Sequence, residues 1–488
     1  MSNSDGIERF GYRQELRRSI GFPDLIFYGL IFMVPIAPFG IFGDAFQVSG
    51  GMVPLAYIVA LIGLVFTAWS YSKMSSAFPM TGGVYNYTGR SLGAPVGFLA
   101  GWLILLDYLV VPVLLYVIAS LAMSEVVEGV PPQAWLIIFV LVNTIINTTG
   151  IKITLRAIRA FIIGELLVLA LFVVVGVVGL LSGRGEFSWD GFYNPETFSI
   201  GLILSAASIT VLSFLGFDGI ALLAEENRGK AKQVGHAMVA ALLLAGLLFV
   251  AQTWIGAMFS DTDKLLESTD ADYVGNAFYI AAEAAAGSHW LYLVCAAATA
   301  IAWGFADTMV AQVASSRLMY AMARDRQLPR FLSKVSVRFG VPVNAVILAA
   351  IVSALLGWVA LENLEGSTLH VFGIPVLDGV ELNSVAFLSS VINFGAICSF
   401  LALHVSVIWH FYIRKRSGKF FSHVVMPIGG LVVLGSVAYY TADEAQWIAG
   451  GWLIVGLIVL AGLYMAGRGP KLPDEGVQVA EREPEPAA

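Results

Sequence analysis

Long apolar runs recur through this chain and restrict its fold more than any other feature. A helix needs about 20 apolar residues to cross the ~30 Å hydrocarbon core of a bilayer. Such runs predict about twelve membrane spans, with these bounds: 24–46, 52–73, 95–123, 133–149, 156–182, 198–224, 235–259, 288–320, 341–361, 383–411, 420–441 and 445–467. A transmembrane barrel would instead show segments of about ten residues with alternating hydrophobicity. The sequence therefore predicts an all-α integral membrane protein.

The composition supports the same class of protein. Hydrophobic residues make up 58% of the 488 residues and charged residues only 12%, whereas a soluble domain carries roughly 25% charged residues. The two cysteines, Cys295 and Cys398, lie inside apolar runs and give neither a disulfide framework nor a metal-binding spacing. The first apolar run is too long for a signal peptide, so we expect it to remain as a helix.

Basic and acidic residues separate between alternate loops. Of the 27 Lys and Arg residues, only Arg184 and Lys264 fall in loops that follow odd-numbered spans, and these loops also hold the acidic run 261–272. Basic residues accumulate on the cytoplasmic side of membrane proteins. We therefore expect a multi-pass protein of the plasma membrane, which is the inner membrane of a bacterial cell, with both termini in the cytoplasm.

Two of the spans carry helix-breaking residues near their middles. Span 1 contains Pro35, Pro38 and Gly40, and span 6 contains Gly216 and Gly219. Proline removes a backbone donor and clashes with the preceding turn, and a bilayer tolerates the freed backbone only where it faces protein or a water-filled cavity. Breaks at corresponding places in two halves indicate a transporter site. The alternative is two ordinary kinks.

The breaks suggest a division of the chain into four parts. We expect a cytoplasmic N-terminal segment 1–22, a core 23–411 in which spans 1–5 and 6–10 form a 5+5 inverted repeat, two accessory helices in 412–468, and a disordered cytoplasmic tail 469–488. The basic segment Ala323–Val341 also contains apolar residues. It is either a short amphipathic helix or a plain connector.

Four acidic residues lie well inside the predicted spans: Asp107, Glu165, Asp218 and Asp307. A charged residue at the centre of a membrane helix costs about 2.5–3.5 kcal/mol on insertion scales. No Lys or Arg lies at a comparable depth in the sequence, so protons, a bound cation or backbone amides must compensate the acids. The functional interpretation is a site for a cationic substrate, coupled to a proton or sodium. The alternative is that some of these acids are protonated or hydrogen-bonded structural groups.

Other side chains near these acids are candidates for recognition and gating. Asp218 lies in the broken stretch of span 6, and aromatic rings attract ammonium groups through cation–π contacts. The aromatic candidates are Tyr108, Phe214, Phe217 and Trp303, which could equally be packing residues. Glu225 and Glu226 end span 6. One interpretation is a gate, in which they pair with arginines of the N-terminal segment or with Arg317; the other is that both are solvated charges at the helix end.

Five stretches of the sequence together resemble a known family. They are 78-FPMTGGVYNYTGRSLG-93, 101-GWLILLDYLVVP-112, 213-SFLGFDGIALLAEE-226, 316-SRLMYAMARDRQLP-329 and 392-INFGAICSF-400. In their order and spacing the chain resembles the amino acid–polyamine–organocation (APC) superfamily of secondary transporters, from about Arg17 to Lys419. It is most similar to the bacterial putrescine-importer-like members. The resemblance implies the 5+5 inverted repeat, two extra helices, and alternating access around broken helices 1 and 6.

The chain also departs from the family pattern in span 1. Amino-acid-carrying members have a glycine-rich break whose amides hold the substrate carboxylate, whereas this chain has 34-VPIAPFG-40. Prolines lack the amide donor. From the position of this break we expect the substrate to contact Ile36, Ala37, Pro38, Phe39 and Gly40, together with Gly216 of span 6.

Two further departures concern coupling. Glu165 stands where some proton-coupled members carry a lysine, and Asp307 stands where the putrescine-importer pattern has a small polar residue. An acid inverts the charge of that lysine, so its mechanism does not carry over. We expect Glu165 and Asp307 to bind the coupling proton or sodium ion.

These observations lead to a first functional hypothesis and its competitors. The hypothesis is secondary active uptake of a polyamine such as putrescine, or a related amine, by alternating access, with Asp107 and Asp218 recognising ammonium groups. One competitor is an amino acid–proton symporter or exchanger, in which a carboxylate meets the amides of Gly40 and Ile41. A receptor or channel-like protein on the same scaffold is a third possibility.

Other classes of function find no support in the sequence. It contains no catalytic triad pattern, nucleotide-binding motif or metal-ligand spacing, so we expect neither enzymatic activity nor a cofactor. The expected partners are a small-molecule substrate, a coupling ion and membrane lipid, without nucleic acid. The sequence does not indicate an oligomeric state.

Overall fold

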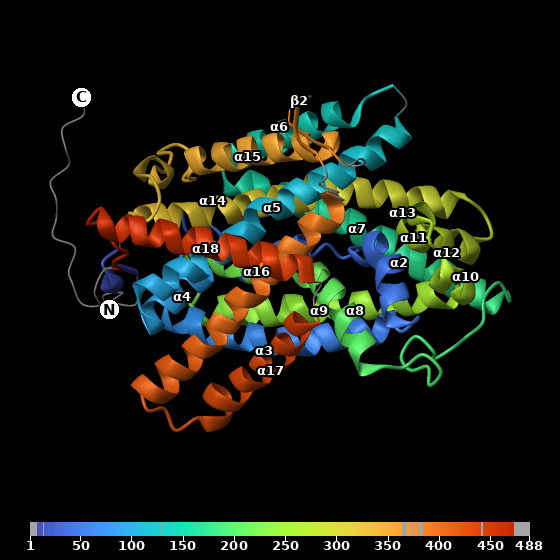
Figure 1. Ribbon diagram of the computed structural model, residues 1–488, viewed down its shortest axis with the longest axis horizontal. Helices are drawn as coiled ribbons and strands as arrows, with labels where there is room; N and C mark the ends of the chain where they lie inside the picture. Colours follow the sequence, from blue (N-terminus) through green and yellow to red (C-terminus); the bar gives the residue numbers. More distant parts are fainter. Residues whose placement is uncertain are drawn as a thin grey trace.

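The computed structural model describes residues 7–12, 14–127, 129–363, 368–371, 374–378, 384–440 and 443–472. Within these ranges most residues are helical, and many of the long helices run along the same axis (Figure 1). Among the described helices, nine are long and apolar enough to cross a membrane, and a bent pair forms a tenth span. Two shorter apolar helices, Pro132–Thr148 and Gly450–Met465, bring the described spans to the predicted twelve.

The first half of the bundle follows a short N-terminal 3₁₀ helix, η1 (Ile7–Phe10). Its helices are α1 (Phe22–Met33), α2 (Pro38–Ser49), α3 (Val53–Ala77), α4 (Gly83–Leu92), α5 (Ala94–Val126), α6 (Pro132–Thr148) and α7 (Ile151–Leu181). Together α1 and α2 form span 1, and their axes differ by 53°. In this half α4 is the helix that lies between two spans.

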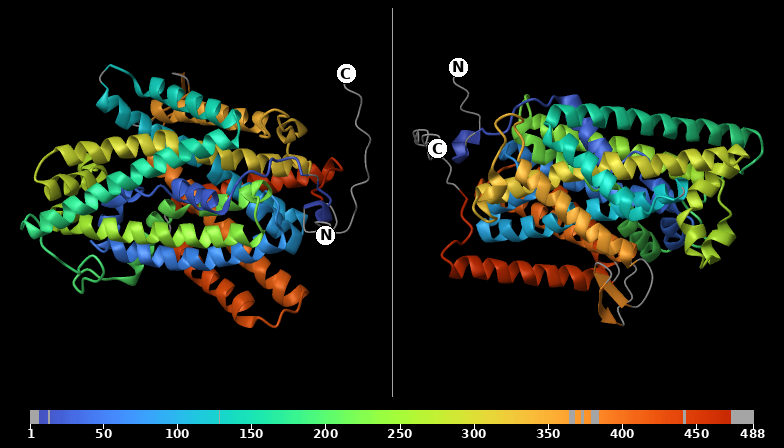
Figure 2. Two further views of the ribbon diagram at one scale, coloured as in Figure 1. Left: turned by 180° about the vertical axis from the view of Figure 1, so that it is seen from behind. Right: turned by 90° about the horizontal axis from the view of Figure 1, so that it is seen from above.

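The second half begins at the second broken span. Its helical elements are α8 (Ile200–Phe214), η2 (Phe217–Glu226), α9 (Lys232–Met258), α10 (Thr262–Glu267), α11 (Ala271–Gly275), α12 (Ala277–Ala286), α13 (Trp290–Ile301), η3 (Ala302–Asp307), α14 (Thr308–Arg324), η4 (Arg330–Ser333), α15 (Val343–Glu362), α16 (Ser384–Val407) and η5 (Ile408–Arg414). The accessory elements are η6 (Phe421–Val425), α17 (Met426–Tyr439) and α18 (Asp443–Met465). In Figure 2, α18 lies along one edge of the bundle in the view from above.

Proline and glycine produce the two breaks, as the sequence predicts. Val34 precedes Pro35 and has a φ of +48°, and residues before proline avoid the helical region. Pro38 then begins α2 at a position where its missing N–H is not needed. Gly216 has a φ of +108° between α8 and η2, a backbone conformation that glycine adopts with little strain.

The two halves pack with opposite orientation around these breaks. Helix α1 packs against η2, and α2 packs against α8, so each half of one broken span contacts the opposite half of the other. A short helix follows the second span of each half, and these helices, α4 and α12, lie at opposite ends of the bundle (Figure 1). This arrangement agrees with the predicted inverted repeat.

Charge distinguishes the two ends of the bundle. We call the end where α1 begins and α14 ends the basic face, and the end where α2 ends and α10 lies the acidic face. Arg184 and Lys264 both lie at the acidic face: Arg184 donates to the carbonyl oxygens of Ala285 and Ala286, and Lys264 belongs to α10. The acidic run 261–272 also starts at α10.

Some local elements differ from the sequence prediction. Helices α4 and α12 were not predicted, nor was an antiparallel hairpin of β1 (Thr368–Val371) and β2 (Ile374–Asp378), which pairs Thr368 with Asp378. The interpretation of Ala323–Val341 as an amphipathic helix is wrong. Arg326 has a φ of +62°, and between the end of α14 and Val341 only the four residues of η4 are helical. Residues 473–488 of the expected tail lie outside the described part of the chain.

Candidate functional site

A cavity of about 130 Å³ lies between the two breaks, near the middle of the bundle. It is lined by Phe32, Met33, Val34, Ala37, Gly40, Ile41, Asp44, Asp107, Val111, Leu114, Leu115, Ile118, Leu212, Ser213, Leu215, Gly216, Trp303, Asp307 and Ile392. Spans 1, 3, 6, 8 and 10 all contribute to this lining. The walls are mostly apolar, and three carboxylates interrupt them.

Four helix ends meet at the cavity: α1 and α8 end there, and α2 and η2 begin there, with Ala37 and Gly216 as their N-caps. Helix α1 ends at Met33 and α8 ends at Phe214, and the residues around both ends line the cavity. The last carbonyl groups of a helix carry partial negative charge. One carbonyl of the break is already bound, since the side-chain amide of Gln252 donates to the Pro35 oxygen at 2.9 Å. The amides at the beginning of α2 and η2 carry partial positive charge, so the backbone alone does not decide the charge of a ligand.

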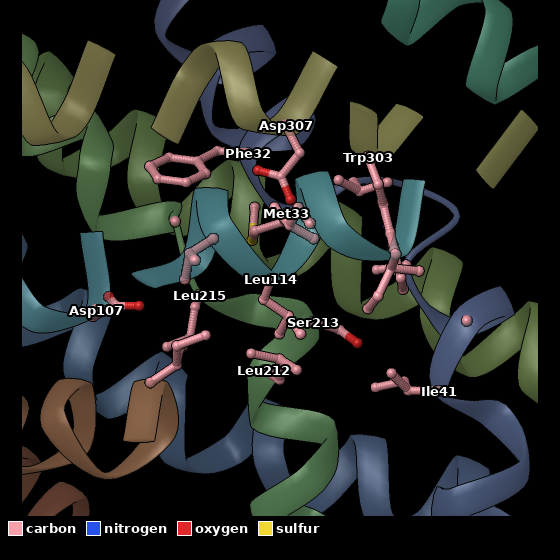
Figure 3. A pocket seen from close by; sticks show the side chains of 18 of the residues that line it. Phe32, Met33, Ile41, Asp107, Leu114, Leu212, Ser213, Leu215, Trp303 and Asp307 are labelled. Carbon is pink, nitrogen blue, oxygen red and sulfur yellow. The ribbon is translucent and has the colours of Figure 1, made fainter. Parts of the chain in front are cut away.

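The three lining carboxylates belong to Asp44, Asp107 and Asp307. Asp107 and Asp307 are buried, and the Oδ1 atom of each has no hydrogen-bond partner among the described residues. Figure 3 shows the Asp307 carboxylate pointing toward Met33, with Asp107 at the far edge of the cavity. None of the residues found to line the cavity is a Lys or Arg. A buried negative charge of this kind needs a proton or a cation.

A short π-helical segment brings Trp303 and Asp307 to the same cavity. Both belong to η3, which interrupts span 8 between α13 and α14. Such π-helical segments are frequent at functional sites. The Trp303 ring lies directly against Gly40 of α2, where a Cβ atom would come within 2.2 Å of the ring. Gly40 is therefore required for the ring to approach the break.

Asp218 lies outside the lining of this cavity. Its Oδ2 atom accepts a hydrogen bond of 2.5 Å from the Tyr108 hydroxyl and one of 3.3 Å from the Tyr71 hydroxyl. The Tyr108 carbonyl oxygen in turn accepts a hydrogen bond from Ser315 of α14. Asp218 thus connects spans 2, 3 and 6 beside the cavity. Its Oδ1 atom has no partner within the described structure.

The predicted substrate-binding residues divide into two groups. Those that line the cavity are Ala37, Gly40, Asp107, Gly216 and Trp303, with the predicted coupling residue Asp307. Those that do not line it are Ile36, Pro38, Phe39, Tyr108, Phe214, Phe217 and Asp218. Several of the second group are packing residues, since Phe39 stacks on Phe278 at 4.0 Å and Phe214 contacts Phe249 at 5.0 Å between ring centroids.

Sequence reasoning missed Phe32 and Asp44. Phe32 lies two residues before the break, and its ring packs so closely on Gly216 that a Cβ atom there would come within 2.5 Å of it. Asp44 is four residues after Gly40, so the two share one face of α2. The spacing of four residues from Gly40 could therefore have identified Asp44 as a lining residue from the sequence. Asp44 is also exposed, so the cavity reaches solvent along α2, toward the acidic face.

Glu165 of α7 does not line the cavity. It is buried, and both of its carboxylate oxygens lack a hydrogen-bond partner in the described part of the chain. It lies close enough to Asp307 for the two charges to interact. The structure therefore places the two predicted coupling residues near each other, with Asp307 facing the cavity and Glu165 behind it.

Ion pairs close the bundle between the cavity and the basic face. Arg317 Nε lies 3.0 Å from Glu226 Oε1, and both side chains are 0% exposed. Arg324 Nη2 lies 2.9 Å from Glu225 Oε1. The predicted pairing with Arg317 is present. The N-terminal segment instead donates to backbone carbonyl oxygens: the Ser19 and Ile20 amides to that of Glu226, at 2.9 and 3.0 Å, and the Gln14 side chain to that of Glu225, at 3.0 Å.

Twelve spans, two broken helices and a central cavity closed at one end define a membrane transporter. The family model described as amino acid permease matches residues 25–461, so the chain belongs to the amino acid permease family, within the APC superfamily that the sequence resembles. The chain is 27% identical to the low-affinity putrescine importer PlaP of Escherichia coli (strain K12), over 94% of this chain and 96% of that protein.

Other relatives of similar length carry other names. The branched-chain amino acid permease BcaP of Bacillus subtilis is 24% identical, over 91% of this chain and 93% of its own length. The methylthioribose transporter of the same species is 23% identical over the same shares. The names of these relatives describe carriers of amines, amino acids and other small molecules.

Proposed function

We propose that this protein imports a small organic cation, a polyamine such as putrescine or a related amine, by proton-coupled alternating access. The observation that carries the proposal is the charge of the central cavity. Three carboxylates line it, and no Lys or Arg is among the residues found there. An ammonium group would complete the buried hydrogen bonds and compensate the charge.

The backbone of the first break supports an amine over an amino acid. A carboxylate would need free amides at this break, but Pro35 and Pro38 have none. The amides of Ala37, Phe39 and Gly40 already donate to carbonyl oxygens of the break, at 2.7, 2.9 and 3.3 Å. A substrate carboxylate would therefore have to displace internal hydrogen bonds, whereas an ammonium group would not.

A second candidate is a proton-coupled carrier of an apolar amino acid. The aliphatic lining of Val111, Leu114, Leu115 and Ile118 favours it, since such a wall suits an aliphatic side chain. The name of the branched-chain amino acid permease agrees with that possibility. The same wall also suits the methylene chain of a diamine, so the two candidates differ in the charge that they require.

The side to which the cavity opens is proposed from the charge distribution and the closed end. With the basic face in the cytoplasm, as the positive-inside rule requires, the ion pairs of Glu225 and Glu226 close the cytoplasmic side. The cavity then opens to the outside along Asp44. In this proposal the structure is an outward-facing state, and both glutamates are gate residues that separate when the cavity opens inward.

Uptake into proteoliposomes distinguishes the two candidates. We expect protein reconstituted in liposomes to accumulate labelled putrescine when an inward proton gradient is imposed. Unlabelled diamines should compete, and neutral branched-chain amino acids should not. Liposomes without protein and liposomes with a collapsed gradient are the controls. Competition by leucine or valine without competition by diamines would show that the amine proposal is wrong.

Substituting Glu165 tests the coupling proposal. Glu165→Gln keeps the shape of the side chain and removes its titration, so we expect uptake to lose its dependence on pH while binding of substrate persists. The measurement is the initial uptake rate against external pH. Glu267→Gln is the matched control, because Glu267 is an exposed acid at the acidic face. An unchanged pH profile with normal expression would exclude Glu165 from proton coupling.

A further inference from the structure

A second cavity, of about 1230 Å³, lies at the basic face. Three parts of the chain surround it: the N-terminal segment around Tyr12, the turn that follows α14, and the end of α18. Its lining residues are Gly11, Tyr12, Glu15, Arg324, Asp325, Arg326, Gln327, Leu328, Pro329, Arg330, Leu463, Gly467, Arg468, Gly469, Lys471 and Leu472. This cavity is separate from the central one and shares none of its residues.

Positive charge dominates the lining. Arg326, Arg330, Arg468 and Lys471 are exposed side chains, and none of them forms an ion pair within the described residues. They come from two elements that are far apart in sequence, the turn after α14 and the end of α18. Four like charges brought to one cavity repel one another, and an anion between them would relieve that repulsion.

The two acids of the lining are occupied by tyrosines. The Asp325 carboxylate accepts hydrogen bonds from Tyr12 at 2.9 Å and from Tyr85 at 2.6 Å. Glu15 accepts one from Tyr320 at 3.0 Å. These bonds hold the turn after α14 against the N-terminal segment and α4. Because the two carboxylates are bound to tyrosine hydroxyls, they do not form ion pairs with the four cations.

A buried amide in the same cavity has no partner. Gln327 is 5% exposed, and neither its Nε2 nor its Oε1 atom makes a hydrogen bond within the described structure. Leaving a buried polar group unsatisfied costs about 1–3 kcal/mol. The backbone amide of Gln327 is bound to the Met322 oxygen at 2.9 Å, so the position of the residue is fixed. Its side-chain NH₂ group is thus a donor in place for a ligand.

We propose that this cavity binds a phosphate-bearing anion, supplied either by an anionic lipid headgroup or by a soluble phosphate. Guanidinium groups bind phosphate oxygens with paired donors, and the Gln327 amide would add a further N–H. Basic pockets between membrane helices on the cytoplasmic side bind lipid headgroups. Leu463 of α18 and Leu472 line the same cavity, which offers acyl chains an apolar contact.

Binding measurements on the full-length protein test this site and its source of phosphate. In a nonionic detergent, we expect native mass spectrometry to show phosphatidylglycerol bound in preference to phosphatidylcholine. Titration with inorganic phosphate tests the soluble source. Binding of phosphatidylglycerol alone identifies a headgroup site, and binding of inorganic phosphate as well identifies a general phosphate site. Failure of both ligands to bind would overturn the proposal.

Two variants locate the binding. Arg326→Gln combined with Arg468→Gln should raise the Kd for the bound ligand about 100-fold, because each of the two lost charge-assisted contacts contributes about tenfold. Gln327→Leu should weaken binding without lowering the thermal stability of the unliganded protein, since its amide has no partner to lose. A purely structural Gln327 would instead change stability alone.

The control keeps the same charge change at the same face. Lys334→Gln combined with Arg338→Gln removes two exposed cations outside the cavity. We expect this control to leave the Kd within about twofold of the original. An equal loss of affinity in the control and in the cavity variant would show that general surface charge attracts the lipid. The proposal would then be wrong, whatever the transported substrate is.

Discussion

Replacing Asp107 with asparagine should lower the initial rate of amine uptake about 10- to 100-fold while leaving the fold intact. The expected loss corresponds to one charge-assisted hydrogen bond to the substrate, about 1.5–3 kcal/mol. Asparagine has nearly the same shape as aspartate but cannot compensate an ammonium charge. The measurement is labelled uptake at several substrate concentrations, with the thermal unfolding midpoint recorded for the same preparation.

The stability part of this prediction rests on the surroundings of Asp107. Its Oδ1 atom is buried without a partner, so removing the charge breaks no bond described for that atom and lowers the cost of placing an acid in the membrane. We therefore expect the unfolding midpoint to stay the same or rise. Normal uptake by Asp107→Asn would show that no substrate cation lies near this carboxylate.

Asp218→Asn is the contrasting variant. Asp218 accepts hydrogen bonds from Tyr71 and Tyr108, and a neutral amide is a weaker acceptor than a carboxylate. This variant should lose stability, by about 1–2 kcal/mol for the weakened bonds. If Asp218 contacts the substrate directly, uptake should fall even where stability is retained. The two variants together separate an acid that faces the cavity from one that connects spans.

The twelve spans and their two breaks were predictable because their causes are local in sequence. A span is a run of apolar residues, and Pro35, Pro38 and Gly216 interrupt helices by their own backbone chemistry. The short elements were not predictable in the same way. Helix α12 has only ten residues and α4 is buried by its packing against α5, so tertiary contacts decide their structure.

The site shows the same division between local and tertiary causes. Intramembrane acids stand out in a sequence because they are costly, and Asp107, Glu165, Asp218 and Asp307 are all buried in the structure. Which acid faces the cavity depends on Tyr71 of α3, whose hydroxyl reaches Asp218 across 147 positions of sequence. No pattern within one span carries that information. The sequence pointed to Asp218 only because this residue lies in the broken stretch of span 6.

Substituting one partner of the buried pair at the basic face should have the largest effect on stability. Arg317→Met leaves Glu226 as a buried charge without its cation, and removing one partner of such a pair costs about 3–5 kcal/mol. Both side chains are 0% exposed, so water cannot compensate the remaining charge. We expect a large fall in folded yield and in the thermal unfolding midpoint in detergent, with little protein left for transport assays.

The double variant Arg317→Met/Glu226→Leu distinguishes a structural pair from a gate. Exchange of a buried ion pair for packed apolar residues is often neutral or stabilising by about 1–4 kcal/mol. The pair itself is incompletely bound, since Arg317 Nη2 and Glu226 Oε2 lack partners among the described residues. We therefore expect the unfolding midpoint to recover to that of the unaltered protein or above it.

Uptake should not recover with stability if the pair is a gate. When the basic face opens, the arginine and the glutamate are hydrated, and this hydration offsets the loss of their mutual attraction. Methionine and leucine would gain no such hydration, and opening would expose their apolar surface to water. The apolar pair therefore favours the closed state. The expected result is a stable protein with slow uptake. A cysteine placed at Ser213, beside the cavity, should react only slowly with a thiol reagent added from the basic face. Recovery of uptake along with stability would show that the pair only holds the fold together.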